Sequence, residues 1–159
     1  MAVHADGAGA VLGSVGYWLL LSLLVGGLAN WLPPPWLLCP PLRPAQRAIP
    51  GIRRWKRWIP DAGGALPRGV PKASLVQRDR QALEQLALET RRAEMVHWLL
   101  LAGWLPAPLW LPPVGVVINL LFACLFNLPC LLLQRHTRSR VERCLQQRQG
   151  WIRRSAPLP

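Results

Sequence analysis

The sequence contains none of the short motifs that mark the common soluble enzymes. It has no P-loop, no dinucleotide-binding glycine motif, no Gly-x-Ser-x-Gly elbow and no His-x4-Asp box. Its cysteines form no Cys-x-x-Cys pair, which argues against a disulfide framework or a zinc site. We interpret them as small hydrophobic residues, and we predict no metal site. They are Cys39, Cys124, Cys130 and Cys144.

Acidic residues are scarce, and so are aromatic residues other than tryptophan. Seven Asp and Glu stand against 19 Lys and Arg, and this net charge of +12 favours nucleic acid, anionic lipid or a phosphorylated substrate as a partner. Nine Trp against two Phe and one Tyr is a composition typical of a membrane interface. Because 52% of the residues are hydrophobic and no nucleic-acid recognition motif is present, the membrane interpretation is favoured and no nucleic-acid partner is expected.

Two apolar stretches predict membrane segments. Residues 10–32 are nearly all apolar and would form a helix of roughly 34 Å, long enough to cross a hydrocarbon core. The stretch lacks the basic n-region of a signal peptide, so we expect a retained anchor. Residues 96–134 predict a helical hairpin around a proline-rich turn, formed either by two short spans or by a re-entrant pair.

Together these features predict an all-α integral membrane protein with an N-terminal span, a cytoplasmic amphipathic helix and a C-terminal helical hairpin. No Lys or Arg precedes residue 43 or lies in the hairpin turn, so the positive-inside rule predicts a multi-pass protein of the cell membrane with its N-terminus outside and its C-terminus cytoplasmic. The expected segments are a short extracytoplasmic N-terminus (1–9), the anchor (10–32), a Pro-rich basic loop (33–73), an amphipathic helix (74–95), the hairpin (96–134) and a basic, weakly ordered tail (135–159).

A dense polar cluster lies where the amphipathic helix enters the apolar hairpin, at residues 89–98. Thr90, Glu94 and His97 share one face of a helix, because residues three, four and seven apart are neighbours. This pattern suggests His97 as a general base oriented by Glu94, with Glu89 nearby as an alternative orienter. The competing interpretation is a juxtamembrane helix whose charged side chains are solvated and pair locally.

Other polar residues are expected at the same boundary. Asn127 lies deep in the second apolar run, where it serves either a helix–helix hydrogen bond or a site. A basic run follows the hairpin from Gln134 to Arg143, and a basic and aromatic run at 52–63 suits either substrate binding or simple membrane anchoring. Convergence of these segments at one interface predicts a site there.

Three stretches of the chain form a distinctive set, namely Arg53-Arg54-Trp55-Lys56 with Pro60-Asp61-Ala62-Gly63; Glu89-Thr90-Arg91-Arg92-Ala93-Glu94-Met95-Val96-His97-Trp98; and Asn127-Leu128-Pro129 with Gln134-Arg135 and Arg138-x-Arg140. In order and spacing they resemble the glycosyl-4,4'-diaponeurosporenoate acyltransferases, membrane enzymes of bacterial carotenoid biosynthesis associated with the last step to staphyloxanthin-type pigments.

The resemblance implies transfer of a fatty acyl group to a sugar hydroxyl of a lipid-soluble, glycosylated carotenoid. The expected partners are this acceptor, an acyl donor and membrane lipids, with an acyl thioester as co-substrate and no resident cofactor. The alternative is a small non-enzymatic adaptor that binds anionic lipid or a partner through its basic loop. The candidate catalytic residues are His97, Glu94 and Glu89. The candidate substrate-binding residues are Arg54, Trp55, Lys56, Asp61, Arg91, Arg92, Trp98, Asn127, Gln134, Arg135 and Arg138.

Overall fold

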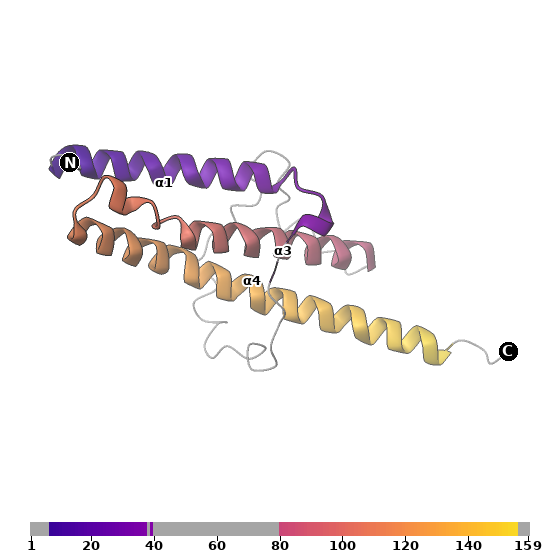
Figure 1. Cartoon of the computed structure of the whole chain (residues 1–159). Coiled ribbons are helices and arrows are strands. Elements are labelled where there is room, and N and C mark those ends of the chain that lie inside the picture. Colours follow the sequence, from indigo (N-terminus) through magenta and orange to yellow (C-terminus); the bar gives the residue numbers. More distant parts are fainter. Residues whose placement is uncertain (1–6, 38, 40–79, 156–159) are drawn as a thin grey trace.

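The computed structural model describes residues 7–37, 39 and 80–155, with side chains as far as residue 149. Three α-helices make up most of this part of the chain, α1 (Gly7–Ala29), α3 (Arg80–Ala102) and α4 (Pro113–Ser155), and no strand occurs in it (Figure 1). Two short 3-10 helices, η1 (Pro34–Trp36) and η6 (Ala107–Leu109), lie in the connections. The all-α prediction is therefore confirmed for the described residues.

Helix α1 is apolar on all sides and packs on its neighbours along one side only. Its buried residues are Trp18, Gly26 and Ala29, whereas leucines on other sides, such as Leu12 and Leu20, are largely exposed. A helix that is hydrophobic all round is typical of a buried core or a membrane span. By length and composition, both α1 and the apolar part of α4 could cross a membrane.

Helices α3 and α4 form an antiparallel hairpin, with α1 lying along the apolar half of it (Figure 1). The link at residues 103–112 contains Pro106, Pro108 and Pro112, which cannot continue a regular helix. Helix α4 then begins at Pro113, a position that suits proline because the first N–H of a helix has no intrahelical partner.

The end of α3 is fitted closely against α1. A Cβ atom at Gly103 would lie 2.6 Å from Leu21 Cδ2 and 3.2 Å from Trp18 Cζ3, so glycine permits this approach. The Tyr17 hydroxyl also donates a hydrogen bond to the Gly103 carbonyl at 2.5 Å. The α1–α3 contact is thus defined at the point where α3 ends.

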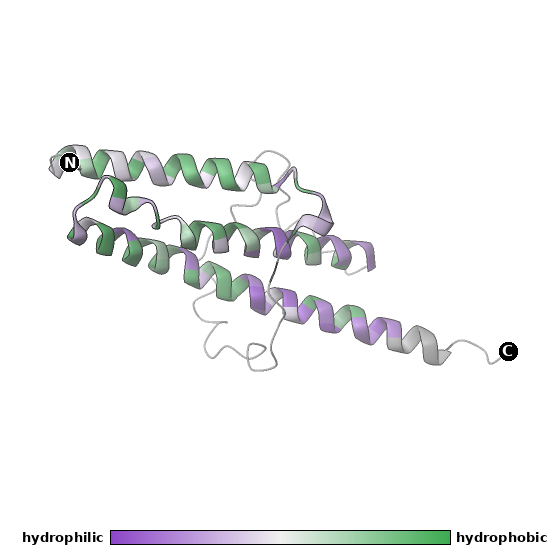
Figure 2. Cartoon of the chain, in the orientation of Figure 1, coloured by the Kyte–Doolittle hydropathy of each residue, from purple (hydrophilic) through white to green (hydrophobic). Residues whose placement is uncertain are grey.

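The helices separate into an apolar half and a charged half (Figure 2). Residues 99–134 contain no Asp, Glu, Lys or Arg, and neither does α1. The charged half contains the start of α3 and the part of α4 beyond Gln134. The apolar part of α4, residues 113–134, is about 33 Å long, close to the thickness of a hydrocarbon core.

The helix bounds differ from the expected segments in three places. Helix α1 begins and ends three residues before the predicted anchor at 10–32. Helix α3 continues through the predicted junction at 95/96. Helix α4 continues past residue 134, so the tail expected to be weakly ordered is helical as far as Ser155. Its Gln, Arg, Glu and Leu residues are good helix formers, and Arg138 and Val141 are buried. Of the predicted loop at 33–73, residues 38 and 40–73 lie outside the described residues, and so do residues 74–79 of the predicted amphipathic helix.

Candidate active site at the boundary between the apolar and charged halves

The centre of the boundary is a buried carboxylate between two arginines. Glu94 of α3 is fully buried, and its Oε1 lies 2.5 Å from Arg135 Nη1 of α4. Its Oε2 lies 3.1 Å from Arg138 Nη1, one turn further along α4. Both arginines are buried as well. Because ions leave water at a high cost, such a group requires close pairing, and this pairing joins α3 to α4.

A second carboxylate extends this cluster toward solvent. Glu142 Oε1 lies 3.3 Å from Arg91 Nη2 and 3.8 Å from Arg138 Nε. Arg91 is about half-exposed, at 46% for its side chain, so it faces water at the edge of the cluster. We call Glu94, Glu142, Arg91, Arg135 and Arg138 the boundary cluster. With three guanidinium groups and two carboxylates it carries one excess positive charge, which favours an anion.

Glu89 and Arg92 lie elsewhere, on the face of α3 that contacts the end of α1. The two side chains form an ion pair, and Arg92 Nε donates to the carbonyl of Ala29 at 2.9 Å. Ala29 is the last residue of α1, where a cation is favoured by the helix dipole. The structure therefore gives these two candidate site residues contacts that attach α1 to α3.

His97 contacts an asparagine of α4. Its Nδ1 lies 3.1 Å from Asn127 Oδ1, while Asn127 Nδ2 donates to the Ala123 carbonyl at 3.0 Å. The second hydrogen bond orients the amide with its oxygen toward the ring, so His97 Nδ1 is the donor, and in the neutral imidazole the lone pair is then on Nε2. Sequence analysis predicted that Glu94 orients His97. The structure places Asn127 against the His97 ring and the Glu94 carboxylate between two arginines.

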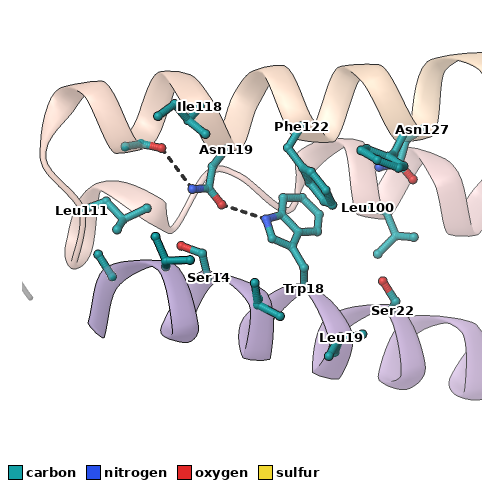
Figure 3. Close-up of a pocket in the computed structure, with 15 residues that line it drawn as sticks. Ser14, Trp18, Leu19, Ser22, Leu100, Leu111, Ile118, Asn119, Phe122 and Asn127 are labelled. Atoms are coloured by element: carbon teal, nitrogen blue, oxygen red, sulfur yellow. Dashed lines mark hydrogen bonds between the residues drawn. The ribbon is translucent and has the colours of Figure 1, made fainter. Parts of the chain in front are cut away.

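An apolar cavity of about 540 Å³ lies between α1 and the first half of α4 (Figure 3). Along α4 its lining runs from Gly115 to Asn127, and along α1 from Ala10 to Ser22. Asn127 both lines the cavity and contacts His97, so one end of the cavity adjoins the histidine. The opposite end is at Leu111 (Figure 3).

One cross-helix hydrogen bond crosses the wall of this cavity. Trp18 Nε1 donates to Asn119 Oδ1 at 2.7 Å, and Asn119 Nδ2 donates to the Gly115 carbonyl at 3.0 Å (Figure 3). The Trp18 ring also packs against Phe122, with centroids 5.1 Å apart. Sequence analysis missed Trp18 among the nine tryptophans. The available signal was its place in the middle of an apolar stretch, since interfacial tryptophans lie near the ends of a span.

Of the remaining candidate site residues, two lie in the part of the chain that the structure describes and four lie outside it. Gln134 is buried on α4 and Trp98 is 38% exposed on α3. Arg54, Trp55, Lys56 and Asp61 lie outside the described residues. Among the residues that the structure describes, no group of three or more His, Cys, Asp or Glu side chains could hold a metal ion.

Cys39 approaches the boundary cluster without joining it. Its Sγ donates to the Arg91 carbonyl at 3.2 Å. Burial raises the pKa of the Cys39 thiol, and the negative charge of Glu94 raises it further, against a lowering by nearby arginines. A thiol with a raised pKa stays protonated at neutral pH and is a poor nucleophile, so Cys39 does not present a reactive thiolate.

The fold and this site define an all-helical protein whose two apolar helices suggest membrane association and whose polar groups gather where those helices become charged. The chain belongs to the glycosyl-4,4'-diaponeurosporenoate acyltransferase family, whose model matches residues 46–147. The match includes α3, the hairpin link and the greater part of α4, and therefore the whole boundary cluster, His97 and Asn127.

Curated relatives carry the same family name. The glycosyl-4,4'-diaponeurosporenoate acyltransferase of Staphylococcus haemolyticus (strain JCSC1435) is 33% identical over 99 residues, which are 61% of this chain and 56% of the relative. That of Staphylococcus aureus (strain MRSA252) is 32% identical over 98 residues, 60% of this chain and 57% of the relative. The match thus spans little more than half the length of these relatives. No solved structure matches the chain.

Proposed function

We propose that this protein is a membrane acyltransferase that esterifies a sugar hydroxyl of a glycosylated carotenoid with a fatty acyl group from an acyl thioester. The names of the relatives support the reaction class. The observation that carries the proposal is the His97–Asn127 pair, which lies at the end of an apolar cavity and on the same two helices as an arginine-rich cluster. This arrangement offers a base, a place for hydrocarbon and a positive charge.

The proposed membrane placement has α1 and the apolar part of α4 crossing the bilayer, with the boundary cluster at the cytoplasmic surface. Large side chains on both helices, including Leu20, Leu24, Leu121 and Leu125, are more than half exposed, which would be costly in water and is favourable in lipid. The basic residues all follow residue 42, so the positive-inside rule directs the charged half to the cytoplasm.

In the proposed reaction, His97 Nε2 takes the proton of the sugar hydroxyl as its oxygen attacks the acyl carbonyl carbon. An ester bond forms, the carbon–sulfur bond breaks, and the proton passes to the departing thiolate. A positioned base of this kind is worth about 10²–10⁴-fold in rate. Asn127 is the positioning residue, because its oxygen holds the proton on Nδ1 and leaves Nε2 basic.

The boundary cluster is proposed to bind the anionic part of the donor. Arg91 is half-exposed at its edge, and the cluster has one more positive than negative group. Planar guanidinium groups suit phosphate oxygens. Glu94 then acts through Arg135 and Arg138, holding their side chains in place. Arg54, Trp55, Lys56 and Asp61 remain predicted contributors from the matched region.

The test is a comparison of lipid extracts from a host that makes the glycosylated carotenoid but lacks an enzyme that acylates it. Expression of the wild-type chain should convert this precursor into an acyl ester, identified by mass spectrometry, and His97→Gln should not. Glu84→Gln, an exposed change on the same helix, is the control and should behave as wild type. If the wild-type chain accumulates in membranes and the precursor stays unacylated, the reaction is wrong, and a lipid-binding adaptor becomes the better explanation.

A further inference from the structure

We infer that the cavity between α1 and α4 binds the acyl chain of the donor in an extended form, with the acyl carbonyl at the Asn127 end and the chain terminus near Leu111. This inference rests on the proposed function and adds to it a residue set that determines acyl-chain length.

The cavity wall is mostly apolar, which favours a hydrocarbon ligand. Its polar side chains at Trp18, Asn119 and Asn127 are hydrogen-bonded within the protein: the indole N–H to Asn119, and each asparagine amide N–H to a carbonyl of α4. The Asn127 oxygen faces His97. The lining adds only the hydroxyls of Ser14 and Ser22 to these groups, and its other residues are apolar or glycine. Such a wall offers few hydrogen bonds to a sugar and favours an apolar occupant.

The length of the cavity suits a single acyl chain. Its lining on α4 extends from Gly115 to Asn127, and the 12 helical steps between these residues correspond to about 18 Å along the helix axis. A zigzag hydrocarbon advances about 1.25 Å per carbon, from C–C bonds of about 1.5 Å, so this length accommodates about 14 carbons. The volume of about 540 Å³ is within the usual range for small-molecule sites.

The orientation follows from where the polar groups lie. The Asn127 end of the cavity adjoins His97, the titratable side chain that the proposed reaction uses as its base. A thioester carbonyl placed there lies beside the proposed base, while its chain passes the rings of Trp18 and Phe122 (Figure 3). The far end is bounded by Leu111 of the link and by Ala10 of α1, and Ser14 lies about one helical turn inside it.

Two substitutions at the far end should change product chain length in opposite directions. Ser14→Phe fills about one helical turn of the cavity, about 5 Å, and should shorten the preferred acyl chain by about four carbons. Leu111→Ala removes a buried wall and should lengthen it. Leu20→Phe, on the exposed side of α1 and away from the cavity, is the matched control and should leave the distribution unchanged.

The measurement is the acyl-chain distribution of the esterified carotenoid by mass spectrometry, at matched protein levels in membranes. Opposite shifts in Ser14→Phe and Leu111→Ala support the inference. If either variant fails to accumulate in membranes, the acyl-chain distribution of the other variant still tests the inference. Unchanged distributions in variants that make product overturn the inference and leave the proposed function standing.

Should the wild-type chain make no ester, a binding experiment separates the two ideas. Purified protein in vesicles is photolabelled with a diazirine-bearing fatty acyl thioester, and the labelled residues are mapped. Label on Trp18 and Phe122 that excess unlabelled acyl thioester displaces, with label on Leu20 unaffected, supports the cavity as an acyl-chain site. Label that is uniform around α1 and resists displacement indicates ordinary bilayer lipid and overturns the inference.

Discussion

The buried carboxylate of Glu94 should be the most costly single charge to remove from this protein. Its two oxygens lie 2.5 Å and 3.1 Å from guanidinium nitrogens of Arg135 and Arg138, whose side chains are only 6% and 4% exposed. Glu94→Gln preserves size and removes the charge, so both arginines keep their burial and lose their shared counter-ion. Removing one partner of a buried ion pair typically costs about 3–5 kcal/mol.

The expected loss lies toward the lower end of that range, about 3 kcal/mol, because Arg138 keeps a second carboxylate. Glu142 Oε1 lies 3.8 Å from Arg138 Nε and is partly exposed. Glu84→Gln is the matched control: it removes the partner of Arg80 at 2.8 Å on the same helix, but both side chains are about half-exposed. An exposed i,i+4 pair is worth about 0.3–0.5 kcal/mol.

The assay is the free energy of unfolding in mixed detergent micelles, followed by circular dichroism for wild type, Glu94→Gln and Glu84→Gln. A double-mutant cycle with Arg138→Met measures the coupling between the two side chains directly. If Glu94→Gln costs no more than Glu84→Gln, the carboxylate is not buried between α3 and α4 as described, and its role in holding the arginines is refuted.

Three further predictions concern two asparagines of the cavity wall and the Cys39 thiol. Asn127→Leu should lower kcat by at least tenfold and at most by the 10²–10⁴-fold that a positioned base contributes, with KM little changed, because His97 loses the group that orients it. Steady-state kinetics at matched protein levels measure this effect, and an unchanged kcat would contradict it. Asn119→Leu leaves the Trp18 indole N–H without its acceptor and should destabilise the protein by about 1–2 kcal/mol, measured in the same micelles, whereas an equal or greater stability would show that the bond adds nothing. Burial raises the pKa of the Cys39 thiol, so its alkylation by iodoacetamide, followed by mass spectrometry across pH, should have a midpoint above the ordinary value of about 8.5, and a midpoint below it would indicate an activated thiolate.

The helices and the meeting of the two polar segments could be read from the sequence because hydrophobic pattern and helix propensity are local. The apolar stretch of α1, the hairpin around prolines 106, 108, 112 and 113, and the convergence of the polar segments at 89–98 and 134–143 all follow from composition along the chain. The extent of α4 past Gln134 was underestimated, since a polar composition after a span predicts equally well a helix or an irregular tail.

The pairing inside the site could not be predicted, because it depends on how α4 is rotated against α3. Helical spacing places Glu94 and His97 on one face, which makes a direct pair plausible. In the structure, each meets a different partner from α4: Glu94 meets arginines 135 and 138, and His97 meets Asn127. Asn119 and Trp18 are 101 positions apart, and no local pattern relates two residues at that separation.

The most direct test of the central claim is reconstitution of the purified chain in vesicles with the glycosylated carotenoid and a radiolabelled acyl thioester. The account predicts that wild type transfers label to the carotenoid and that His97→Gln, folded and inserted to the same extent, loses at least about 100-fold in rate. Equal transfer by wild type and His97→Gln would contradict the assignment of the base, and no transfer by well-folded wild type would contradict the proposed acyltransferase function itself.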